Sequence, residues 1–298
     1  LFKTAMPITI GALFFSLCNT IDAVLVMNRL GSAGFGPKEA TELYGAYTGY
    51  AVTFYTLPAS LITALAATLV PVIAGAAARG KEGLPKIQKT SSAAIRLTLL
   101  IVLPCAFGFA LLPGPLLSLL FSRASDVAIA APLLRLLAPA VVFTALSTIT
   151  TSILQAMGAM RAPIFSFAAG GLVKIAANFV LIGMPLVNIH GAPLGTLACY
   201  LVISAVNLLI LRRRCGKFPA FGRVFLIPAV CSLAATLSAR GLYSFLLSWL
   251  SSRFALAAGI LLAAILYFAL LAALGVIRKE DMRMLPKFGR KTEEIREL

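Results

Sequence analysis

An apolar run at 163–186 sets the first limit on the fold of this chain, because it is long enough to cross a bilayer. A transmembrane helix needs about 20 mostly apolar residues, and runs of that length recur along nearly the whole sequence. Inside a membrane, only helices and closed barrels satisfy every backbone polar group. The sequence therefore predicts an all-α polytopic transmembrane bundle with about eight spans. These are expected at 5–28, 43–78, 93–112, 131–156, 163–186, 193–211, 224–246 and 254–277.

Composition supports the membrane class. The chain is 60% hydrophobic and 12% charged, whereas soluble domains are about 45–50% apolar and about 25% charged. Its net charge of +16 would suggest nucleic-acid binding in a soluble protein. Here the excess of Lys and Arg falls in alternate loops, as the positive-inside rule requires. We therefore expect a multi-pass membrane protein, with both ends cytoplasmic and no nucleic-acid partner.

Lys174 lies near the middle of the run at 163–186, roughly 16–18 Å along a helix from either end. A lysine stem snorkels over only part of that distance. Gly170, Gly171 and Asn178 lie one turn away and form a stripe of small and polar residues. Such a stripe faces other helices or a water-filled cavity. Lys174 and Asn178 are therefore candidates for a substrate cavity, and the alternative is a lysine that binds a carbonyl and fixes helix packing.

Asp22 is the only acidic residue that we expect inside the membrane. Ser16, Asn19 and Asp22 follow at three-residue steps in the first span, so Asn19 and Asp22 share a helical face. Asn19 is a further candidate for the cavity lining. Asp22 is a candidate site for a coupling proton or cation, and the alternative is a carboxylate that is paired with an arginine or capped by hydroxyls.

The sequence offers little for catalysis. It has one histidine and five cysteines, without a CxxC pair, a Walker motif or paired membrane carboxylates. We therefore predict no catalytic residues, no metal site, no cofactor and no enzymatic activity.

The balance of embedded charges instead favours transport of an anion. Four embedded cations against one carboxylate suit an anionic substrate, and Arg135 joins Lys174 as a candidate that binds it. The four are Arg96, Arg135, Lys174 and Arg240.

Several segments carry a resemblance to a known family. They are LFKTAMPITIGALFFSLCNTIDAVLV, LYGAYTGYAVTFYTLPASLITALAATLVPVIAGAAA, LLRLLAPAVVFTALSTITTSILQAMGAMRAP, LVKIAANFVLIGMP and GAPLGTLACYLV. In order and spacing, this set resembles the second half of the stage V sporulation protein B family. That family belongs to the MATE-like superfamily of polysaccharide and lipid II flippases.

The resemblance implies a particular organisation. Residues 1–212 would be the second six-helix lobe of a two-lobe flippase, and 213–298 would add two helices and a basic cytoplasmic tail. The N-terminal lobe would be missing from this chain and would be its partner. The expected substrate is a lipid-linked oligosaccharide or a lipid II-like precursor, moved among membrane lipids by alternating access. Two alternatives stay open: a multidrug or cation antiporter of the same superfamily, and a non-transporting scaffold for cell-wall or sporulation enzymes.

Overall fold

The computed structural model describes residues 20–216 and 221–275, and every regular element in those ranges is a helix. Seven helical segments of this part are long and apolar enough to cross a membrane, which confirms the predicted all-α transmembrane bundle. A helix at 20–32 precedes α2 (Pro37–Ala46), α3 (Thr53–Ala77), α4 (Leu84–Leu111), α5 (Pro113–Leu120), α6 (Ala124–Ala156), α7 (Arg161–Ile182), α8 (Gly191–Cys215), α9 (Phe221–Leu246) and α10 (Ser252–Ala273).

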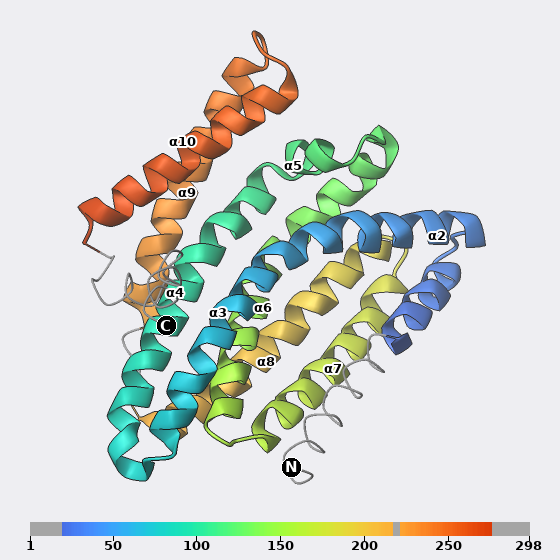
Figure 1. Cartoon of the computed structure of the whole chain (residues 1–298). Coiled ribbons are helices and arrows are strands. Elements are labelled where there is room, and N and C mark those ends of the chain that lie inside the picture. Colours follow the sequence, from blue (N-terminus) through green and yellow to red (C-terminus); the bar gives the residue numbers. More distant parts are fainter. Residues whose placement is uncertain (1–19, 217–220, 276–298) are drawn as a thin grey trace, which may run out of the picture.

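The bend in the second span has a cause that the sequence did not indicate. A π-helical segment, Tyr47–Val52, joins α2 to α3 without a break, and Figure 1 shows the chain changing direction there. π-Helical segments are recognised sites of helix bending. Pro58 and Pro71, the prolines of this span, lie further along, inside α3. The π segment also leaves Tyr47 buried, facing α8.

Two helices begin well before their apolar windows. Helix α4 starts at Leu84 rather than at 93, and α6 starts at Ala124 rather than at 131. The added turn of α4 has Pro85 in its first positions and carries Lys86 and Lys89. Proline is favoured in a first helical turn, which suits a helix that begins at Leu84. The polar first turns of α4 therefore extend this span beyond its apolar window. A window of hydropathy alone underestimates the length of both helices.

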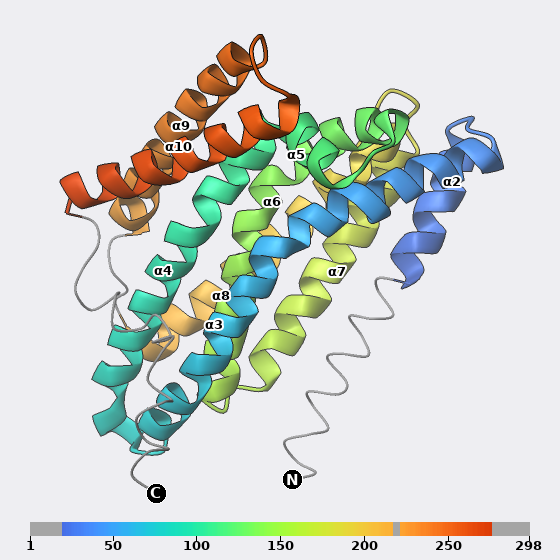
Figure 2. The same ribbon diagram turned by 45° about the horizontal axis from the view of Figure 1, so that its top comes forward.

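Helix α6 is the central helix of the bundle. It packs against α3, α4 and α8, while α8 packs against α7, and α9 packs against both α4 and α10. Figures 1 and 2 show α9 and α10 together at one edge, with α7 and the helix at 20–32 at the opposite edge. The division of the chain at 212/213 stays a prediction.

Buried polar groups link the central helices. The Nδ2 atom of Asn207 on α8 donates to the Oγ1 atom of Thr151 on α6 at 2.9 Å. Tyr55 on α3 forms a hydrogen bond with Thr144 on α6. Away from water, such side-chain hydrogen bonds hold neighbouring helices together. The hydroxyls of Thr144 and Thr151 on α6 therefore help to fix the packing of α6 against α3 and α8.

Candidate functional site

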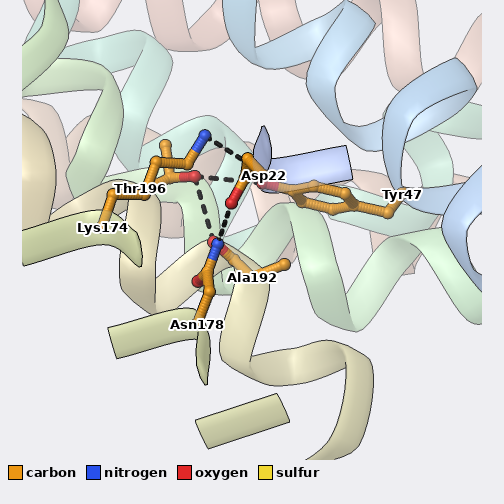
Figure 3. A network of polar contacts seen from close by, with 6 residues as sticks. All are labelled: Asp22, Tyr47, Lys174, Asn178, Ala192 and Thr196. Atoms are coloured by element: carbon orange, nitrogen blue, oxygen red, sulfur yellow. Dashed lines mark hydrogen bonds and ion pairs between the residues drawn. The ribbon is translucent and has the colours of Figure 1, made fainter. Parts of the chain in front are cut away.

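An ion pair joins the helix at 20–32 to α7. The Nζ atom of Lys174 lies 2.8 Å from the Oδ2 atom of Asp22, and the two side chains are 16% and 10% exposed. Asn178, one turn after Lys174, donates its Nδ2 hydrogen to Oδ1 of the same carboxylate. Both carboxylate oxygens of Asp22 are therefore engaged by α7, as Figure 3 shows.

A glycine on α8 leaves room for this arrangement. Asn178 is fully buried, and a Cβ atom at Gly195 would collide with its Oδ1 atom. That Oδ1 atom has no hydrogen-bond partner, and an unsatisfied buried acceptor is destabilising. Gly191, one turn earlier, similarly permits α8 to approach Ile182 of α7. The two glycines therefore let α8 approach α7 closely.

A second polar contact lies beside the ion pair. The hydroxyl of Tyr47 is 3.1 Å from the Oγ1 atom of Thr196, and Thr196 donates to the carbonyl of Ala192 at 3.0 Å. Figure 3 places these three residues next to Asp22 and Asn178. The network therefore draws on the helix at 20–32, the π-helical segment, α7 and α8.

Arg29 makes a further attachment between the same two helices. It follows Asp22 by two helical turns, so both side chains lie on one face. Its Nε donates to the carbonyl of Phe179 at 2.9 Å, and its guanidinium lies 4.2 Å from the centre of the Phe179 ring. A Cβ atom at Gly183 would collide with the guanidinium. The sequence reasoning missed Arg29, although its seven-residue spacing from Asp22 was a readable signal.

The pairing changes the electrostatics that we expected from the sequence. We expected Lys174 to present a charge to a cavity, yet the structure gives it a carboxylate partner, so the two charges cancel. Opposite charges attract strongly in a low-dielectric interior, but each loses its hydration. Removing one partner would leave the other as an uncompensated buried charge. A proton or a cation on the carboxylate would therefore weaken the attraction between Asp22 and Lys174.

The predicted site residues do not form one group. Lys174, Asp22 and Asn178 come together, whereas Asn19 lies outside the described residues. Arg135 is exposed on α6 and lines a different pocket with Arg240 of α9. Arg135 therefore does not contribute to the network around Lys174. The functional roles of all five candidates stay predictions.

Within the described ranges, no group of three or more His, Cys, Asp or Glu side chains is placed to hold a metal ion. The chemistry available at the network is thus that of one carboxylate, one ammonium, an amide and two hydroxyls. Such a set has the groups to bind and release a proton, a cation or an anionic ligand.

Comparison with known proteins gives consistent matches. A family model described as lipid II flippase MurJ matches residues 12–250. Stage V sporulation protein B of Bacillus subtilis (strain 168) is 25% identical over 296 residues, which cover 97% of this chain and 55% of that protein. Lipid II flippase MurJ of the same strain is 25% identical over 217 residues, covering 72% of this chain and 39% of that protein.

The fold also matches a solved structure. Lipid II flippase MurJ in an inward closed conformation aligns with a TM-score of 0.64 at 17% identity, covering 89% of this chain and 53% of that chain. This chain therefore spans about half the length of the solved structure and of the sporulation protein, and less of the flippase relative.

Proposed function

Because this chain belongs to the lipid II flippase MurJ family, we propose that it forms a helical lobe of a flippase for lipid-linked cell-wall precursors. The substrate would be a lipid II-like molecule or another lipid-pyrophosphate-linked sugar in a bacterial plasma membrane. A second lobe would complete the transport cavity, and both ends of this chain would be cytoplasmic. We do not propose the antiporter or scaffold alternatives, because the matched relatives that are named for an activity are lipid II flippases.

The observation that carries this proposal is the ion pair between Asp22 and Lys174. Alternating access requires an element with two arrangements whose balance a ligand can shift. An ion pair between two helices supplies one, because a proton or a cation on Asp22 removes the attraction that holds Lys174. The freed ammonium then becomes available to an anionic group.

The helix at 20–32 is the element that would move. Its polar attachments to α7 include the pair at Asp22 and the contact of Arg29 with Phe179. We propose that the paired state is the resting arrangement. Protonation of Asp22 or binding of a cation there would open it, and the pyrophosphate of the substrate would then contact Lys174. Lys174 thus acts in substrate binding only when its carboxylate partner is neutralised.

Transport of a fluorescent lipid II analogue by the whole protein, reconstituted into vesicles, tests the proposal. We expect Lys174→Ala to abolish transport. Lys86→Ala is the matched control, because Lys86 is an exposed lysine on α4, away from the network. Transport by Lys174→Ala at the rate of the unmodified protein would remove the ion pair from the mechanism.

A further inference from the structure

Two arginines from different helices share a pocket at the α5 end of the bundle. Arg135 of α6 and Arg240 of α9 both line a cavity of about 430 Å³. The ends of α4 and α5 complete its walls, with Leu112 and Gly114 among the lining residues. Both arginines are exposed. Neither arginine belongs to the network around Asp22.

The chemistry of this pocket favours an anion. No Asp or Glu lines it, and Tyr243 and Ser244 add hydroxyls to the two guanidinium groups. In the described part of the chain, the two guanidinium groups make a single hydrogen bond, from Nη1 of Arg240 to the carbonyl of Leu111 at a long 3.5 Å. Guanidinium groups bind phosphate through paired N–H donors. Two of them without a carboxylate leave two positive charges available to a ligand.

The depth of the pocket matches that of lipid headgroups. Trp249, in the turn after α9, is 79% exposed, and tryptophan is enriched at membrane–water interfaces. Arg240 precedes the end of α9 at Leu246 by six residues, which is about 9 Å along the helix. A long arginine side chain reaches from there to the phosphate layer.

An apolar groove adjoins the arginine pocket. It has a volume of about 700 Å³ and lies between α4, α9 and α10. Leu112 lines both spaces, and Ala239 of the groove immediately precedes Arg240. Other residues of its wall are Leu100, Pro104, Phe109, Tyr267 and Phe268. A charged pocket that continues into an apolar groove has the arrangement of a phospholipid, with a headgroup above an acyl chain.

We propose that this is a binding site for an anionic phospholipid of the surrounding bilayer. Arg135 and Arg240 bind its phosphodiester, and one acyl chain occupies the groove between α4, α9 and α10. With no carboxylate to contact a choline, the pocket favours a net negative headgroup over a zwitterionic one. The bound lipid joins α9 and α10 to the α4–α6 part of the bundle. This assignment does not rest on flippase activity.

Native mass spectrometry of the full chain, titrated with phosphatidylglycerol or phosphatidylcholine of identical acyl chains, tests the proposal. We expect Arg135→Gln and Arg240→Gln each to weaken phosphatidylglycerol binding about tenfold, as loss of one charge-assisted contact predicts, and to leave phosphatidylcholine binding unchanged. Arg253→Gln is the matched control, because Arg253 lies at the same end but lines the neighbouring pocket. It should bind phosphatidylglycerol normally.

A second pair of variants separates the headgroup from the chain. Ala263→Trp fills the groove and should weaken binding of the long-chain lipid without altering binding of a short-chain phosphatidylglycerol. Arg240→Lys retains the charge and should still bind phosphatidylglycerol more tightly than phosphatidylcholine, which keeps the test valid if the glutamine variant unfolds.

Several outcomes would overturn the assignment. Equal losses in Arg253→Gln would indicate a diffuse surface effect. Equal binding of phosphatidylcholine would remove the charge argument. Competition by millimolar inorganic phosphate alone would mark a free-anion site. Tighter, arginine-dependent binding of undecaprenyl phosphate would assign the pocket to a polyprenyl lipid instead.

Discussion

The ammonium of Lys174 on α7 lies 2.8 Å from the carboxylate of Asp22 on the helix at 20–32, which comes much earlier in the sequence. Each residue alone would be an isolated charge inside an apolar span. Together they form a neutral unit that Asn178 completes by donating to the second carboxylate oxygen. We therefore expect the position of the helix at 20–32 to depend on the charge state of Asp22.

Replacing one partner of the ion pair should destabilise the protein more than replacing both. We expect Lys174→Gln or Asp22→Asn alone to lower the free energy of unfolding by about 3–5 kcal/mol, because the remaining charge stays buried without a partner. The double variant Asp22→Asn/Lys174→Gln should recover much of that loss. Denaturant unfolding in detergent, arranged as a double-mutant cycle, measures the coupling. Additive losses would show that the two side chains do not interact.

A side chain at Gly195 should disturb the network from α8. Gly195→Ala places a methyl group against Oδ1 of Asn178, and overpacking of this kind costs about 1–3 kcal/mol. We expect a lower melting temperature in Gly195→Ala, and recovery in Gly195→Ala/Asn178→Ala.

Gly45→Ala is the matched control for that experiment. Nothing lies within 4 Å of a Cβ atom at Gly45 in α2, so the change should be neutral or stabilising by up to about 1 kcal/mol. If both alanine variants behaved alike, the close approach of α8 to Asn178 would be contradicted.

The contact between Arg29 and Phe179 should favour arginine over lysine. Arg29→Lys keeps the charge but loses the Nε donor and the planar group over the ring. We expect a loss of about 1–2 kcal/mol in unfolding free energy, with a smaller loss in Phe179→Leu, which keeps the carbonyl acceptor. Thermal unfolding of the two variants in one detergent compares them. A lysine variant as stable as the unmodified protein would contradict the geometry.

Much of the fold was predictable because apolar runs report spans directly. The windows at 163–186 and 224–246 predicted α7 and α9 closely. The start of α4 at Leu84 was not predictable from hydropathy, since its first turns are polar and extend beyond the apolar window. The π-helical segment at Tyr47–Val52 was missed because no proline or glycine pair marks it.

The candidate site was predictable residue by residue but not as a set. Asp22 and Lys174 each stood out as charges in apolar spans, yet their pairing depends on tertiary packing between distant helices. Tyr47 and Thr196 have no distinguishing feature in the sequence. They come together only because the π-helical segment packs against α8 in the fold. Arg135 was grouped with Lys174 by chemistry alone, and the fold separates them.

Neutralising Asp22 should uncouple transport from its driving gradient while leaving substrate recognition intact. In Asp22→Asn, the ammonium of Lys174 has no carboxylate partner, so an anionic headgroup can reach it without a prior proton or cation. We therefore expect this variant to bind a lipid II analogue at least as tightly as the unmodified protein. Its downhill transport should no longer respond to an imposed proton or sodium gradient, whereas Lys174→Ala should bind the analogue about tenfold more weakly, as loss of one charge-assisted contact predicts.

Asp126→Asn is the matched control for both measurements, because it also replaces an aspartate by asparagine. Asp126 on α6 accepts a hydrogen bond from Tyr50 at 2.6 Å, outside the network around Asp22. It should keep both binding and gradient dependence. If Asp22→Asn still responded to the gradient as the unmodified protein does, Asp22 would not be the coupling residue, and the ion pair would act only in holding the helix at 20–32 against α7.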